Sequence, residues 1–175
     1  MYLVEVVPNF STGDPVKAKL IADCFRNRKN VALLNCTADA DHNRCVVTAA
    51  GAPQEIRSAL IDSARVAAEE IDLNAHRGVH PRIGALDVLP VVPLEETPES
   101  VADELVRQVG QDLFDKLGQT YRLAAGADLS EKLLHLADGF SLAFESAAPS
   151  FHLFDLAVGV AGAVALRLMV YCKTD

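Results

Sequence analysis

Hydrophobic and polar residues alternate along the first half of the chain in a way that predicts strands and helices in turn. Four apolar runs predict strands over residues 2–7, 31–36, 45–50 and 85–92. Between them, apolar residues at helical spacing predict one helix that Asp14 caps and that reaches about Arg28. A second helix is predicted from Pro53 to about Ile71. The resulting order is strand, helix, strand, strand, helix, strand.

This order of six elements is that of the ferredoxin-like, or split βαβ, arrangement. The pattern continues with a third helix, which Thr97 caps, Pro98 begins and apolar residues line as far as Leu117. Two strands and a short helix are predicted after it, over residues 120–124, 166–171 and 129–138. We therefore expect one α+β domain over residues 1–175, a ferredoxin-like two-layer sandwich extended by C-terminal helices and strands.

Turn-forming residues separate the predicted elements. Residues 8–13 are typical of a turn, and residues 37–44 are typical of the polar tip of a hairpin between the second and third strands. Residues 74–84 form a predicted loop before the fourth strand. That strand is expected to end at Pro90 and Pro93, because proline cannot donate a backbone hydrogen bond.

Charge and cysteine usage narrow the expected partners and compartment. With 16 Lys and Arg against 24 Asp and Glu residues, the formal net charge is −8, which argues against nucleic acid as a partner. The apolar residues 153–170 carry Asp155 and Arg167, so the uncharged run falls short of the roughly 20 residues that a membrane span needs. Four scattered cysteines and no secretory leader favour a reducing cytoplasm over a disulfide framework.

Residues 76–88 bring two imidazoles, two guanidiniums, a carboxylate and two glycines into a segment that cannot be a regular helix. Pro81 favours an extended backbone at His80, while Gly78 and Gly84 permit φ values that are closed to other residues. An imidazole is the side chain best suited to take up and return a proton near neutral pH. His80 is therefore the predicted catalytic residue.

Other polar residues of this segment are predicted to contact a substrate. Arg82 suits a substrate carboxylate, which a guanidinium binds in bidentate fashion, with an exposed salt bridge as the alternative. Asp87 lies within a strand, where a carboxylate needs a hydrogen bond or a cationic partner. His76 lies four residues before His80, but the glycine and proline between them deny the helix on which that spacing would bind a metal, so no metal is expected.

Two earlier turns offer further candidates. The hairpin tip carries an Asp-x-Asp pattern that could chelate a hard cation, but it lacks the glycine and distal glutamate of an EF-hand loop, and a solvated turn is the alternative. The turn after the first strand can present backbone amides and small donors to a ligand. The predicted substrate-binding residues of these turns are Asn9, Ser11, Asp39, Asp41, Asn43 and Arg44.

Residues 7–13, 39–48 and 78–88 read VPNFSTG, DADHNRCVVT and GVHPRIGALDV. In this order and at these separations, they resemble the N-terminal subdomain of glutamate formiminotransferase, and the resemblance covers most of the chain. It implies a ferredoxin-like α/β fold and transfer of the formimino group from N-formimino-L-glutamate to N5 of tetrahydrofolate, in cytoplasmic histidine degradation. It also implies that His80 is the catalytic base, with tetrahydrofolate as co-substrate.

The same resemblance sets expectations for assembly. Members of the family carry a second subdomain, with folate between the two halves, and we expect that folate-side subdomain to be absent from residues 1–175. Two classes of function are then open. The first is an enzyme that is completed by a homodimer or by a separate C-terminal subdomain partner, and the retained His80, Pro81 and Arg82 favour this class. The other is a non-catalytic folate-binding or interaction module, which the absent half and Val79, in place of the family's usual glutamate, favour.

Overall fold

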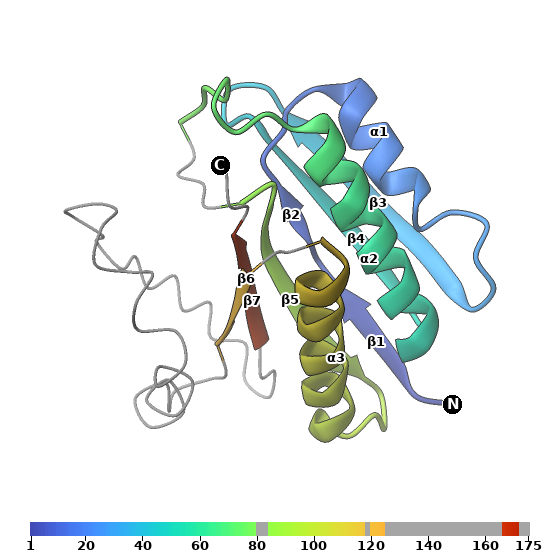
Figure 1. The fold of residues 1–175 in the computed structure, drawn as a ribbon. Coiled ribbons are helices and arrows are strands. Elements are labelled where there is room, and N and C mark those ends of the chain that lie inside the picture. Colours follow the sequence, from blue (N-terminus) through green and yellow to red (C-terminus); the bar gives the residue numbers. More distant parts are fainter. Residues whose placement is uncertain (80–83, 118–119, 125–165, 172–175) are drawn as a thin grey trace, which may run out of the picture.

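Helices and strands alternate along the computed structural model, which describes residues 1–79, 84–117, 120–124 and 166–171 (Figure 1). The strands are β1 (Leu3–Val6), β2 (Asn9–Phe10), β3 (Val31–Asp39), β4 (Arg44–Gly51), β5 (Leu86–Leu94), β6 (Thr120–Ala124) and β7 (Leu166–Tyr171). The helices are α1 (Pro15–Asp23), α2 (Pro53–Glu70) and α3 (Glu99–Leu117). The short helix predicted over residues 129–138 lies outside the described residues.

The strands form one sheet with the predicted split βαβ arrangement. β1 and β2 lie between β4 and β5 and are antiparallel to both, while β3 pairs with the outer side of β4. On the other side, β7 pairs with β5, and β6 pairs with β7. The ferredoxin-like α+β prediction, with its C-terminal strand extension, is therefore confirmed.

Two predicted strand limits are wrong, and both errors involve proline. Residues 8–13 were expected to be a turn, but Asn9 and Phe10 form β2, and the carbonyl of Pro8 accepts a hydrogen bond from the Val47 amide (3.1 Å). β5 does not end at Pro90 or Pro93 but continues to Leu94. A proline in a strand loses a donor but keeps its acceptor, and the Pro90 carbonyl accepts from the Val7 amide (3.1 Å).

Helix ends differ from prediction in two further places. Asp14 caps α1 as predicted, since its carboxylate accepts from the Val16 amide at 2.7 Å. The helix ends at Asp23 rather than near Arg28, and the turns that follow include Asn27 with a φ of 55°. Thr97 was expected to cap α3, but its hydroxyl donates to the carbonyl of Leu3 (2.9 Å) and accepts from the Leu3 amide (3.0 Å).

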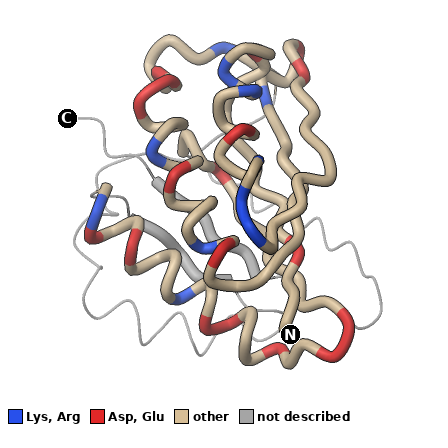
Figure 2. Tube along the Cα trace, turned by 90° about the vertical axis from the view of Figure 1, so that its right-hand side faces the viewer, with Lys and Arg blue, Asp and Glu red and all other residues tan. Residues whose placement is uncertain are grey.

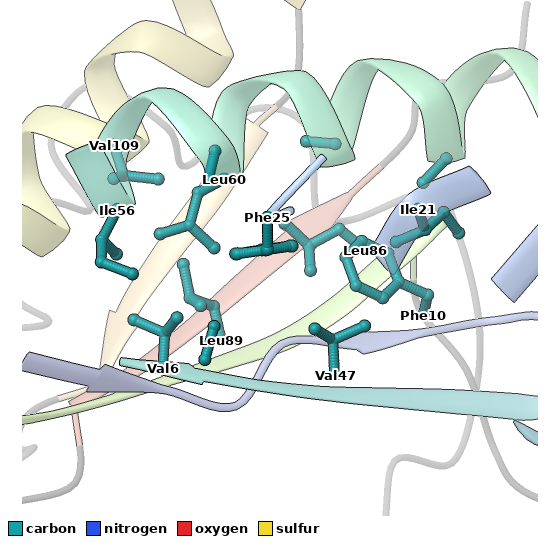
Figure 3. Packing of buried hydrophobic residues seen from close by; sticks show 14 of the residues in the cluster. Val6, Phe10, Ile21, Phe25, Val47, Ile56, Leu60, Leu86, Leu89 and Val109 are labelled. Atoms are coloured by element: carbon teal, nitrogen blue, oxygen red, sulfur yellow. The ribbon is translucent and has the colours of Figure 1, made fainter. Parts of the chain in front are cut away.

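The hydrophobic core lies between the sheet and the helices (Figure 3). Alternate residues of β4 are buried, as expected for a strand with one face in the core. The predicted stripes of α2 and α3 supply the other side, and fully burying each large side chain contributes roughly 1.5–3 kcal/mol. The largest of these buried side chains include Val6, Phe10, Ile21, Phe25, Val47, Ile56, Leu60, Leu86, Leu89 and Leu113.

Charged residues are interspersed along the helices in the view of Figure 2. The Arg57 guanidinium on α2 donates to the Asp112 carboxylate on α3 (2.8 Å), so an ion pair joins these two helices. Of the helices in the described residues, none is both long enough and apolar enough to cross a bilayer.

Candidate functional site

Three segments that carry predicted site residues lie together at one end of the sheet, opposite the N-terminus (Figure 1). They are the turn that joins β2 to α1, the tip of the β3–β4 hairpin, and residues 74–79 after α2. Each segment is rich in polar residues. We call this group the loop cluster, defined as residues 11–14, 39–44 and 74–79.

Asn43 holds the loop cluster together. Its side-chain carbonyl accepts a hydrogen bond from the Gly13 amide (2.7 Å), and its side-chain amide donates to the carbonyl of Arg77 (2.7 Å). The residue adopts a φ of 49°, a left-handed conformation that asparagine tolerates better than most residues. These two bonds join both polar groups of its side chain to backbone, and the predicted contact of Asn43 with substrate stays a prediction.

Two glycines let the hairpin tip approach its neighbours. A Cβ on Gly13 would lie 2.3 Å from the Asp39 carbonyl oxygen, and one on Gly78 would lie 2.6 Å from the His42 carbonyl oxygen. Gly78 was expected to be needed for an unusual φ, but its φ is not in the left-handed region. The physical requirement at Gly78 is instead close packing of backbone against backbone.

Asp39 and His42 form a hydrogen-bonded pair at the hairpin tip. Asp39 Oδ1 accepts from the amides of Asp41 (2.9 Å) and His42 (3.0 Å), and Asp39 Oδ2 lies 2.9 Å from His42 Nδ1. The hydrogen bond from the His42 amide, followed by that from its ring, holds the pKa of Asp39 below its usual range. The carboxylate is therefore ionised near neutral pH.

His76 and Arg77 support the loop cluster from the side of α2. His76 is only 6% exposed, and its Nε2 donates to the carbonyl of Asn43 (3.1 Å). The Arg77 guanidinium donates to the carbonyl of His76 (3.0 Å). The structure places His76 in the packing that supports the tip, and its predicted contact with substrate stays a prediction.

The segment that contains His80 is held at both of its described ends. Before it, the Val79 amide donates to the carbonyl of Asp41 (3.2 Å). After it, the carbonyl of Gly84 accepts from the Ser11 hydroxyl (2.7 Å) and the Gly84 amide lies 3.4 Å from Asp87 Oδ1. The predicted site residues His80 and Arg82 themselves lie outside the described residues.

The remaining predicted residues fall into buried and exposed groups. Asn9 and Ser11 are buried, and the Asn9 side chain donates to the carbonyl of Val7 (2.8 Å). Asp87 is 8% exposed at the start of β5. Asp41 is exposed at the hairpin tip, and Arg44 lies opposite Asp39 in the last strand pair before the turn.

Sequence reasoning missed the His42 ring as a site residue. The signal was available, because an Asp three residues before a His in a short polar tip can accept from both the backbone and the ring.

The structure also brings Cys36 and Cys45 together, with their Sγ atoms 3.9 Å apart. Burial raises the pKa of Cys45 to about 12. Within the described ranges, no group of three or more His, Cys, Asp or Glu residues could hold a metal ion.

Comparison with known proteins identifies the class to which this fold and loop cluster belong. Residues 3–150 match the family model of the formiminotransferase domain, N-terminal subdomain, and the chain belongs to this family. A glutamate formimidoyltransferase from Thermoplasma acidophilum is 40% identical over 128 residues, and one from Streptococcus pyogenes is 38% identical over 118 residues. A formimidoyltransferase-cyclodeaminase from Gallus gallus is 37% identical over 117 residues.

The matched region is only part of each relative. It covers 73% of this chain but 42% of the Thermoplasma protein, and 66% of this chain but 39% of the Streptococcus protein. For the Gallus protein, the figures are 66% and 22%. The curated relatives therefore contain long regions beyond the part that this chain matches.

Proposed function

We propose that this chain takes part in transferring the formimino group from N-formimino-L-glutamate to N5 of tetrahydrofolate, with His80 as the general base and acid. Tetrahydrofolate is the co-substrate, and no metal is required. The proposal sets the reaction in the cytoplasm, where free thiols such as those of Cys24, Cys36 and Cys45 persist.

One observation carries the proposal: the family's three sequence motifs meet in the loop cluster, although they lie about thirty residues apart in the chain. The bond from the Gly13 amide to Asn43 and the bond from the Val79 amide to the Asp41 carbonyl join them. A transferase needs groups from separate segments held in fixed geometry, because orientation of the reactants supplies much of the rate. The Val79 amide donates to the Asp41 carbonyl and the Gly84 carbonyl accepts from the Ser11 hydroxyl, so the described residues on either side of His80 are tied to the first two motifs.

The chemistry needs a residue that can both take and give a proton. When N5 attacks the amidine carbon, N5 becomes an ammonium and must lose a proton, and the departing glutamate nitrogen must gain one. A histidine performs both steps because its ordinary pKa lies near neutrality. In the proposed mechanism, His80 removes the N5 proton.

Substrate binding requires opposite charges for the two ends of formiminoglutamate. The amidinium is cationic, and the carboxylates of Asp41 and Asp87 suit it, while Asp39 already accepts from the backbone and from a ring nitrogen. The glutamate carboxylates require cations, which Arg44 and Arg82 supply through charge-assisted hydrogen bonds.

The relatives are longer than the matched region. We propose that the site has a second side, which a C-terminal subdomain or a second copy of the chain supplies. A binding module without turnover is the second candidate function, and the Val79 position favours it because the family usually has an acidic residue there. The exposed Val79 side chain cannot hold a cation or move a proton.

A transfer assay and a binding titration on the same preparation separate the two functions. The full chain is mixed with formiminoglutamate and tetrahydrofolate over a range of protein concentrations, and folate binding is measured by calorimetry. The proposal predicts product formation, with specific activity rising with concentration if two copies form the site. Folate binding without product supports the module, and neither binding nor product refutes both functions.

A further inference from the structure

His42 and Asp39 form an acid–base pair that the proposed function does not use. A carboxylate only accepts, so His42 Nδ1 carries the proton in the 2.9 Å bond to Asp39 Oδ2. In the neutral ring, Nε2 then keeps its lone pair. A carboxylate behind Nδ1 is the device that fixes the orientation and tautomer of a proton-transferring histidine.

The Asp39 carboxylate is oriented by bonds other than the one to the His42 ring. Its other oxygen, Oδ1, accepts from the amides of Asp41 and His42, which closes the turn at the hairpin tip. These two bonds from backbone amides to the Asp39 carboxylate hold the turn without the ring. The His42 ring is an addition that the turn does not need.

Exposure argues against a structural role for the ring. The His42 side chain is 54% exposed and that of Asp39 is 55% exposed. Exposed ion pairs contribute little to stability, because solvent screens them and the side chains lose freedom. A half-exposed imidazole with a fixed Nδ1 is better explained by a reactive Nε2.

Packing fixes the pair beside the segment on which the proposed function depends. The carbonyl of His42 lies against Gly78, where a Cβ would be only 2.6 Å away, and the carbonyl of Asp41 accepts from the Val79 amide. The hairpin tip cannot move away from this loop without breaking these contacts. The ring is thereby held at the edge of the loop cluster.

We propose that His42, oriented by Asp39, is a second proton-transfer group in formimino transfer, and this inference rests on the proposed function. As the N5–carbon bond forms and the carbon–nitrogen bond to glutamate breaks, the bonding electron pair moves to the glutamate nitrogen. In this inference, protonated His42 takes over the acid step from His80 and donates its Nε2 proton to that nitrogen, while His80 keeps the base step and takes the proton from N5. The two groups then re-equilibrate with solvent, so protons and electrons balance.

The test compares His42→Ala with the wild-type chain in the formimino transfer assay. The inference predicts a fall in kcat of about 100-fold or more, a KM within about twofold, and partial restoration by added imidazole. His42→Gln keeps a hydrogen-bond donor for Asp39 but cannot titrate, so it should be as slow and should lose one limb of the pH profile. Asn35→Ala, an exposed change on β3 of the same hairpin, is the control and should leave turnover unchanged.

The pH profile is read against the other charged or titratable groups of the packed segments. At the hairpin tip these are Asp39, Asp41 and Arg44, on residues 11–14 there is Asp14, and on residues 74–79 they are His76 and Arg77. Because Asp39 accepts from the ring, Asp39→Asn should weaken its orientation and reduce kcat less than His42→Ala does. Unfolding curves of all variants should overlay that of the wild type.

A labelling experiment gives a readout that does not depend on turnover. Diethyl pyrocarbonate acylates accessible imidazoles, so His42 should react faster than buried His76, and formiminoglutamate with tetrahydrofolate should slow the reaction at His42. Wild-type turnover together with undiminished turnover of His42→Ala would overturn the inference and leave the proposed function intact. If the wild-type chain transfers nothing, the proposed function fails first, and this inference fails with it.

Discussion

Replacement of Asn43 by alanine tests whether one side chain holds the loop cluster together. The change removes the bond to the Gly13 amide, which is partly buried, and the bond to the Arg77 carbonyl, which is exposed. Net contributions of about 1 and about 0.5 kcal/mol are reasonable for these two bonds. Alanine at a φ of 49° adds a left-handed backbone cost of about 1 kcal/mol.

These terms sum to a loss of about 2.5 kcal/mol in the free energy of unfolding. The measurement is equilibrium unfolding in urea, analysed from the midpoint and the m-value. Asn43→Gly is the matched variant, because glycine accepts the left-handed φ but lacks both hydrogen bonds. It separates the backbone cost from the bonds, and it should lose less stability than Asn43→Ala.

A second readout is local. Hydrogen exchange at the Gly13 amide should accelerate in both variants, because that amide loses its acceptor. A loss of less than about 0.5 kcal/mol for Asn43→Ala, together with unchanged exchange at Gly13, would contradict the role assigned to Asn43.

Three other predictions follow from packing and burial. Gly13→Ala should destabilise the chain by about 1–3 kcal/mol, because its Cβ would lie 2.3 Å from the Asp39 carbonyl oxygen, and wild-type stability in urea would contradict this. The Arg57 guanidinium lowers the pKa of Asp112 in the folded chain. The ion pair therefore stabilises the folded state fully above the ordinary aspartate pKa of about 3.9, and this stabilisation is lost as the pH falls through the lower folded pKa. Asp112→Asn should flatten the pH dependence of the free energy of unfolding in that range. Burial raises the pKa of Cys45 to about 12, so at pH 8 the folded chain should react with iodoacetamide at Cys45 about a thousandfold more slowly than an exposed thiol does, and rapid labelling would refute the burial.

The periodic elements of the fold could be predicted from the sequence because each depends on its own pattern. The stripe through Ile56 and Leu60 is buried as predicted, and so is the alternation along β4. The hairpin followed from two β-rich runs around a polar tip. Local chemistry was sufficient at the start of α1, where Asp14 and Pro15 act as their types predict.

The failures at Pro90 and at Thr97 share a cause, which is a hydrogen-bond partner far away in the sequence. Pro90 stays inside β5, where its carbonyl accepts from the amide of Val7, a residue between β1 and β2. Thr97 bonds to Leu3 of the neighbouring strand β1 instead of capping the helix next to it. No local pattern shows such partners, because the competing hydrogen bond comes from a residue far away in sequence.

The candidate site shows the same division. The polar motifs could be found from the sequence, but the roles of Asn43 and His76 in holding backbone could not. Both side chains bond to atoms of other segments, and only the packed tip brings those atoms within reach. His42 was missed for a different reason: the hairpin tip was interpreted by its Asp-x-Asp pattern, so only the carboxylates, the amide and the guanidinium of the tip were considered.

The most direct test of the proposed transfer chemistry is the turnover of His80→Ala with formiminoglutamate and tetrahydrofolate, measured beside the wild-type chain at matched concentrations. Loss of a general base lowers the rate by roughly 100- to 10,000-fold. We predict a loss of this size in kcat, with folate affinity by calorimetry and the urea unfolding midpoint unchanged. Turnover equal to that of the wild type would contradict the role of His80 and with it the proposed mechanism.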